Sequence, residues 1–221
     1  MNTLEDNNNR NKIIEIATKI FYEKGYDKTS FSAIAKYCNI TKGLITYHFG
    51  TKSNLAKEVV LNYNIHIKNI VEAKIYNTFT GYNQYYSTVA ELLIIFELFN
   101  NDKKALDFYL EYLNSGFESQ FSNGYMNFYT VLDRHDHLEV NRKPNEFKIL
   151  SIASMFSGLS LFYSYYTGKL ECSYEEYTYH SLQVQLKILN IKDKDIDRII
   201  EEGKKIVDQL DYKLVPYFKI L

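Results

Sequence analysis

The sequence predicts an all-α protein with a small N-terminal domain and a larger C-terminal helical domain. Apolar residues recur every three or four positions along most of the chain, and we find no strand-like alternation. Only two prolines and nine glycines interrupt the 221 residues. Hydrophobic residues make up 46% of the chain, enough for a packed core. We place the domains at residues 1–51 and 52–221.

The first predicted helix covers residues 11–24. Gly25 follows it, at the place where a left-handed helix cap favours glycine. Its apolar stripe repeats at helical spacing and consists of Ile13, Ala17, Ile20 and Phe21. One face of this helix should therefore be buried.

Two short helices follow and form a predicted helix-turn-helix. Ser30 can cap the first of them, residues 31–37, and Thr41 can cap the second, residues 42–49. Asn39 lies in the turn between them, and asparagine tolerates a left-handed backbone. Two short helices joined by a tight turn make the helix-turn-helix motif, so the N-terminal domain should hold three helices.

The rest of the chain is also helical in pattern. A long helix is predicted over residues 52–75, where apolar side chains recur in steps of three and four. The other predicted helices cover residues 82–99, 102–115, 124–138, 146–167, 173–190 and 194–210.

The second helix of the predicted motif has the features of a DNA-recognition helix. Its N-terminal residues would approach base edges, so we expect Thr41, Leu44 and Thr46 to face the bases. Gly43 costs about 1 kcal/mol of helix propensity but removes a side chain where backbone would approach DNA. Ser30 completes the expected DNA-binding set. The expected phosphate donors are Lys42, Tyr47, His48 and Lys52. The alternative is a small three-helix bundle whose polar side chains are only solvated.

The same stretch resembles the N-terminal domain of the tetracycline-repressor (TetR) family of bacterial transcription regulators. The resemblance covers about residues 10–58, without gaps. It departs from the family pattern at Asn39, where glycine is usual, and at Leu44 and Thr46, commonly Thr and Tyr. The operator sequence therefore stays open. The matching residues are Ile14, Ala17, Phe21, Gly25, Tyr26, Thr29, Ser30, Ile34, Ala35, Lys42, Gly43, Tyr47, His48, Phe49, Lys52 and Leu55.

The resemblance implies a homodimer that binds a palindromic DNA operator and is released by a small-molecule inducer. In that family the last long helices form the dimer interface. We expect this role for the helices at 146–167 and 173–190, the first of which carries small residues that let another helix approach. The expected interface residues are Ser154, Ser157, Gly158, Leu161, Leu182, Leu186 and Leu189. The alternative is that they form the core of a single chain.

Aromatic residues gather in the middle of the chain and suit a pocket for an apolar or aromatic ligand. The expected lining is Phe108, Tyr109, Tyr112, Phe117, Phe121, Tyr125, Met126 and Tyr129. Plain core packing is the alternative, and so is a DNA-binding regulator without ligand control. His135 and His137 lie between carboxylates, but one short run is a poor ligand set, so a solvated helix end is favoured. We expect no metal and no cofactor.

Charge, composition and missing motifs argue against several other classes of protein. The net charge is −1, yet residues 1–60 carry nine basic and six acidic side chains, as a DNA-binding head on an acidic body would. No nucleotide-binding or hydrolase motif is present, which argues against an enzyme. The uncharged run 149–168 has spanning length, but its serines favour a buried packing helix over a membrane span. The polar N-terminus lacks a signal peptide, so we expect a cytoplasmic protein.

Overall fold

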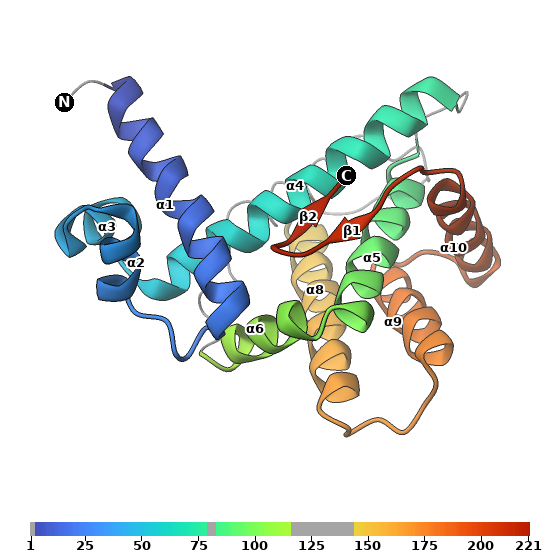
Figure 1. Ribbon diagram of the computed structural model, residues 1–221. Helices are drawn as coiled ribbons and strands as arrows, with labels where there is room; N and C mark the ends of the chain where they lie inside the picture. Colours follow the sequence, from blue (N-terminus) through green and yellow to red (C-terminus); the bar gives the residue numbers. More distant parts are fainter. Residues whose placement is uncertain (1–2, 79–82, 116–143) are drawn as a thin grey trace. The chain divides into compact units, whose positions relative to one another are not determined.

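The computed structural model describes residues 3–78, 83–115 and 144–221. In these ranges the protein is helical apart from one two-stranded hairpin (Figure 1), which confirms the predicted all-α class. Two compact units can be separated. The first contains Met1–Ile67, Glu97–Phe121 and Tyr212–Leu221, and the second contains Lys68–Phe96 and Ser122–Asp211. The predicted division at residue 51 does not coincide with these units and stays a prediction.

Three helices form the N-terminal part of the first unit, which we call the head (residues 3–49). They are α1 (Thr3–Lys24), α2 (Phe31–Cys38) and α3 (Lys42–Phe49), and α1 packs on both of the others. Their shared core is apolar because the predicted stripe of α1 faces inward. The fully buried residues of this shared core come from all three helices and are Ile13, Ala17, Phe21, Ile34 and Ile45.

The first unit also holds the start of α4 (Lys52–Thr78), the last turns of α5 (Gln84–Asn101), α6 (Lys103–Asn114) and a C-terminal hairpin. The hairpin pairs β1 (Leu214–Val215) with β2 (Lys219–Ile220) in antiparallel register. Its tip residue Phe218 packs on aromatic rings of α1, α4 and α6, with centroids 5.3–6.2 Å away. The end of the chain is thereby built into the core of this unit.

The second unit is built mainly from α5, α8 (Pro144–Tyr166), α9 (Tyr174–Ile188) and α10 (Asp193–Asp208). Here α8 packs along α9, and α9 packs on α10. Ser173 and Glu176 form a reciprocal capping box that starts α9. Among the helices described, none is both long enough and apolar enough to span a lipid bilayer.

Two differences separate the predicted elements from those observed. The helix expected from residue 11 begins at Thr3, because the polar N-terminal stretch continues α1. The hairpin was not predicted at all. The helix predicted at 124–138 lies outside the described residues, and the other predicted helices agree with α2 to α10 to within a few residues at each end.

Candidate nucleic-acid interface

The turn between α2 and α3 has the local geometry that its sequence predicts. The Ala33 amide donates a hydrogen bond to Ser30 Oγ at 3.2 Å, and the Leu44 amide donates to Thr41 Oγ1 at 3.3 Å. Asn39 has φ 56° and so takes the left-handed backbone expected of it. Both capping hydroxyls accept one bond here and keep a proton to donate to an outside acceptor.

Helix α3 buries one side and exposes the other. Ile45 and Phe49 are 0% and 5% exposed and hold α3 on the head. Tyr47 is 68% exposed, so its ring is not part of the core of the head. The other exposed positions of this helix and its cap are Thr41, Lys42, Gly43 and Thr46, and Leu44 is partly exposed. The side chains expected to face DNA therefore share a solvent-facing surface.

No internal contact explains why position 43 is glycine. A Cβ placed there would meet only Thr41 Oγ1 within 4 Å among the described residues, at an ordinary 3.8 Å. The backbone is ordinary helix, without the positive φ that favours glycine. An alanine would fit and would add about 1 kcal/mol of helix propensity. No contact among the described residues therefore requires glycine at this position.

Lys52 makes an internal contact that its sequence position did not predict. Its Nζ donates a hydrogen bond to the Tyr26 carbonyl at 2.8 Å and lies 4.1 Å from the centroid of the Tyr26 ring. The start of α4 is thereby tied to the loop that follows α1. Two ammonium protons are left for other acceptors, so a phosphate contact is compatible with this position.

His48, one of the four expected phosphate donors, is less exposed than Lys42 and Tyr47. Its side chain is only 4% exposed, and Nε2 is 3.7 Å from Asp6 Oδ1, within range of a charge pair but too long for a hydrogen bond. The N-terminal turns of α1 therefore cover this histidine. Sequence reasoning missed the contact because a polar stretch such as residues 3–10 has no apolar periodicity to reveal its packing.

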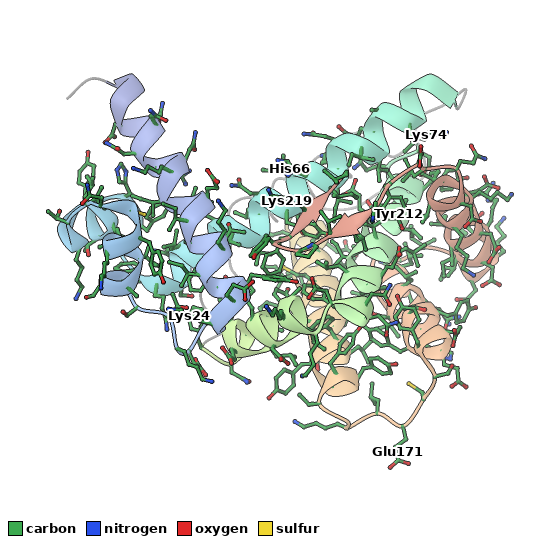
Figure 2. The ribbon with its side chains drawn as sticks, in the orientation of Figure 1. Lys24, His66, Lys74, Glu171, Tyr212 and Lys219 are labelled. Atoms are coloured by element: carbon green, nitrogen blue, oxygen red, sulfur yellow. The ribbon has the colours of Figure 1, made fainter. Side chains whose placement is uncertain are left out.

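The same N-terminal turns also reach α3 and α4 through Arg10. Its guanidinium bonds Glu58 at 2.8 Å and lies 5.4 Å from the Phe49 ring centroid. Helix α2 adds exposed residues not singled out from the sequence. Tyr37 is 62% exposed, and Lys24 Nζ (Figure 2) lies 5.5 Å from the centroid of its ring. These cationic and aromatic groups extend the polar surface of the head beyond α3.

The three described members of the expected ligand pocket form part of the core of the first unit. Phe108, Tyr109 and Tyr112 lie on α6 and are at most 7% exposed. The Phe108 ring is 5.1 Å from that of Phe21 and 5.3 Å from that of Phe218, centroid to centroid. The remaining expected lining and the two histidines lie outside the described residues; they are Phe117, Phe121, Tyr125, Met126, Tyr129, His135 and His137.

The expected dimer residues are engaged largely within the chain. Ser154 Oγ donates to the Gln185 carbonyl at 3.1 Å, so α8 and α9 lie in close contact. The small face of α8 thus contacts α9 of the same chain, and the expectation that it also meets a second subunit stays a prediction. The buried members are Ser154, Leu182, Leu186 and Leu189. Ser157, Gly158 and Leu161 keep partial exposure.

The sequence of the head now has a counterpart among known proteins. Residues 13–59 match the family model described as bacterial regulatory proteins, tetR family. Most of the head and the start of α4 are therefore similar to the tetR-family domain. The match begins within α1 and ends within α4, so it contains the whole helix-turn-helix.

Two curated relatives are similar to part of this chain. The "Biofilm operon icaADBC HTH-type negative transcriptional regulator IcaR" of Staphylococcus aureus (strain Newman) is 39% identical over 62 residues, 28% of this chain and 33% of IcaR. IcaR of Staphylococcus epidermidis is 40% identical over 53 residues, 24% of this chain and 29% of that protein. The chain thus matches only about a third of the length of these relatives.

Among solved structures, the crystal structure of a gamma-butyrolactone receptor (ArpA-like protein) aligns with 93% of this chain and 99% of its own. The TM-score is 0.46 and the sequence identity 13%.

Proposed function

We propose that the chain is a DNA-binding transcriptional regulator whose helix α3 enters the major groove. The observation that carries this proposal is Gly43, a glycine in an exposed helix that no contact of the described residues explains. A DNA backbone or base edge approaching α3 closely would supply the missing reason. The tetR-family match over residues 13–59 supports the same conclusion.

The side chains divide into three groups in this proposal. Lys42 and Tyr47 are exposed donors and bind phosphate oxygens, which fixes the register of the helix. Thr41, Leu44 and Thr46 face base edges, and the leucine meets thymine methyl groups.

The third group supports α3 from within the head. Lys52 joins the start of α4 to Tyr26, and His48 meets the N-terminal turns of α1 at Asp6. Their role is to position the recognition helix, with Lys52 also able to reach a phosphate. Ser30 contributes by capping α2 and by presenting its hydroxyl hydrogen to the DNA backbone.

We propose further that the protein is a cytoplasmic repressor that acts as a homodimer on a palindromic operator. Paired half-sites about 34 Å apart need two recognition helices. The description of IcaR as a negative regulator supports repression. We place the dimer interface on parts of α8 and α9 that remain exposed, Ser157 and Leu161 among them. The proposal assigns the chain no catalytic activity.

A small apolar or aromatic molecule bound in the C-terminal domain would release the repressor. Such a ligand can weaken DNA binding only through its different affinity for the two states of the protein. One observation favours the second candidate, a regulator without ligand control. The aromatic residues Phe108, Tyr109 and Tyr112 are packed against other rings, as core residues are.

The proposal is tested first by selecting fragments of the host genome with the purified full chain. A recovered duplex then serves in anisotropy titrations over a series of salt concentrations. Lys42→Gln should lower the slope of log affinity against log salt by about 0.9 for each subunit, since one phosphate contact is lost. Lys194→Gln is the matched control, an exposed lysine on α10.

Two outcomes would count against the proposal. The first is a protein that retains no duplex even at low salt. The second is a salt slope that Lys42→Gln and Lys194→Gln change equally. Thr46→Ala should instead change which sequences are recovered, because its side chain is placed at a base edge. If the recovered sequences stay the same, Thr46 is not a base contact.

A further inference from the structure

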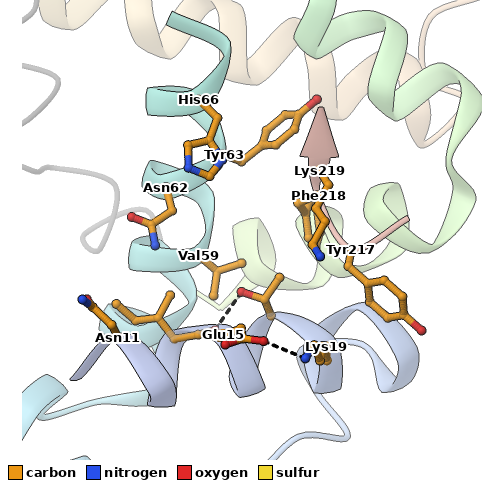
Figure 3. A pocket seen from close by; sticks show the side chains of 12 residues that line it. Asn11, Glu15, Lys19, Val59, Asn62, Tyr63, His66, Tyr217, Phe218 and Lys219 are labelled. Carbon is orange, nitrogen blue, oxygen red and sulfur yellow. Dashed lines mark hydrogen bonds and ion pairs between the residues drawn. The ribbon is translucent and has the colours of Figure 1, made fainter. Parts of the chain in front are cut away.

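A cleft of about 210 Å³ lies within the first unit, between α1, α4 and the hairpin (Figure 3). Its wall is mostly apolar, and Val59 of α4 and Phe218 at the hairpin tip are among its lining residues. Both side chains are almost fully buried, at 2% and 6% exposure, so they belong to the rigid core. Ligand pockets commonly combine such an apolar wall with a few polar groups. Drug-sized sites are larger, so this cleft suits a molecule of one or two rings.

Charged side chains line the same cleft. Glu15 and Lys19 of α1 form an ion pair of 2.8 Å, and Lys219 of β2 is a further cation. The hydrogen bond and charge of Lys19 lower the pKa of Glu15, and the charge of Lys219 lowers it too. Lys219 is therefore close enough to interact electrostatically with the Glu15 carboxylate. His66 of α4 also lines the cleft (Figure 3).

These groups leave the cleft with a positive charge in excess. One carboxylate faces two ammonium groups at neutral pH, even without counting His66. Lys219 has no ion pair among the described residues, whereas Lys19 is paired with Glu15. A bound monoanion would balance the charge of the second ammonium group, and a charge-assisted hydrogen bond would hold the anion.

The hairpin wall of the cleft has a strained backbone. Tyr217 and Phe218 have φ values of 68° and 53°, in the left-handed region that residues other than glycine rarely adopt. Tertiary contacts hold this turn, because Tyr217 Oη donates to Glu23 Oε1 at 2.9 Å and the Phe218 ring is buried. Backbone strain of this kind is concentrated at functional sites and ligand clamps, so the cleft is where a ligand is expected.

We propose that this cleft binds a small aromatic carboxylate. The rings lie on Val59 and Phe218, and the carboxylate accepts hydrogen bonds from the Lys219 ammonium beside the Glu15–Lys19 pair. This site is separate from the aromatic pocket expected in the middle of the chain. The proposal concerns binding alone, so it stands whether or not the chain is a DNA-binding regulator.

Isothermal titration calorimetry of the full chain with three probes of one shape tests the charge preference. The probes are 2-naphthoate, neutral 2-naphthylmethanol and cationic 2-naphthylmethylammonium. We expect 2-naphthoate to bind at least about tenfold more tightly than the alcohol, as a hydrogen bond between charged groups would give, and the cation to bind weakest. Equal affinity for the anion and the alcohol would overturn the proposal.

Variants then locate the site. Lys219→Gln should remove most of the preference for 2-naphthoate over the alcohol, whereas Lys213→Gln, an exposed lysine on the same hairpin, should keep it. Asn62→Trp places a large side chain at the cleft and should abolish binding of both probes. Asn69→Trp, also exposed on α4, should not. If Asn62→Trp binds 2-naphthoate like the unchanged chain, the anion occupies another site and the proposal fails.

Discussion

Three helices in the described part of the chain contain a glycine, and two of these glycines, Gly43 and Gly158, have opposite surroundings. A Cβ at Gly43 of α3 would meet only one atom within 4 Å, at 3.8 Å. A Cβ at Gly158 of α8 would lie 2.8 Å from the side-chain amide of Gln185 on α9, closer than real Cβ atoms come. The second glycine is thus explained by packing between two helices. The first is not explained by packing among the described residues, and in the proposed function it allows DNA to approach α3 closely.

Gly203 of α10 is the glycine whose added Cβ would clash most severely with a neighbouring helix. A Cβ there would lie 2.4 Å from Val89 Cγ1 and 2.7 Å from its Cβ, atoms close to the α5 backbone that cannot move away cheaply. Gly203→Ala should therefore lower the free energy of unfolding by about 3 kcal/mol, through overpacking that exceeds the gain in helix propensity. Urea denaturation measures the free energy of unfolding of Gly203→Ala, both with Val89 and in a chain that also carries Val89→Ala. Val89→Ala removes Cγ1 but keeps Cβ, so it should relieve part of the loss; a loss that is equally large with and without Val89→Ala would refute packing at this position.

Glu91 of α5 extends the comparison to a buried polar atom, because its Oε1 has no hydrogen-bond partner among the described residues. Burial is the main cause that raises its pKa from 4.5 to about 7, with Lys68 lowering it and Glu72 raising it. Because the folded state holds this proton more tightly, the free energy of unfolding falls as pH rises from about 4.5 to about 7 and is flat above. Glu91→Gln should remove that loss.

The expected gain from Glu91→Gln is about 2 kcal/mol at pH 8, less than the full shift would give because the residue keeps some exposure. At pH 4 the gain should disappear. Urea denaturation at both pH values measures it, and Glu201→Gln, an exposed carboxylate, is the control. A gain that is the same at both pH values would have another cause than ionisation of Glu91.

The local signals in the head were sufficient to predict it. Ser30, Asn39 and Thr41 act on their immediate neighbours, and the structure shows each in the predicted cap or turn. The hairpin could not be predicted in this way. Its turn places Tyr217 and Phe218 at positive φ, where sequence patterns call for glycine or asparagine, and it is held by rings about a hundred or more residues away in the chain. Only long-range packing explains it.

Interface residues were harder to predict for a related reason. A small residue on a helix permits close approach, but the sequence does not say whether the approaching helix belongs to the same chain. Ser154 illustrates this, because we expect it at a dimer interface and its hydroxyl also donates to the Gln185 carbonyl of the same chain. His48 and Lys52 show the same ambiguity for charged residues, since each makes a contact inside the head. Residue type predicted the chemistry of these positions but not the partner.

Gly43→Ala tests the other side of the comparison. With no clash to offset it, the substitution should raise the free energy of unfolding by about 1 kcal/mol, the difference in helix propensity. Affinity for a selected operator should fall at the same time, because the added methyl group would occupy space needed by DNA. Urea denaturation and anisotropy on one preparation measure both. A variant that is more stable and binds DNA unchanged would remove the main support for the proposed function.

Gly158→Ala should have the smallest effect on stability. The clashing atoms are the far end of the Gln185 side chain, which can rotate away, and about 1 kcal/mol of helix propensity is gained. We expect a change of within about 0.5 kcal/mol, with a larger gain when Gln185→Ala removes the clash.

Sedimentation of Gly158→Ala distinguishes whether this face of α8 packs on α9 of the same chain or on a second subunit. If α9 of the same chain covers it, the dimer dissociation constant should stay the same within about twofold. If a second subunit packs there instead, the added methyl group would weaken the dimer by about tenfold or more while leaving the folded subunit unchanged. That result would support the predicted place of Gly158 in the dimer interface and leave Gly203 as the glycine of this unit that packing within one chain explains.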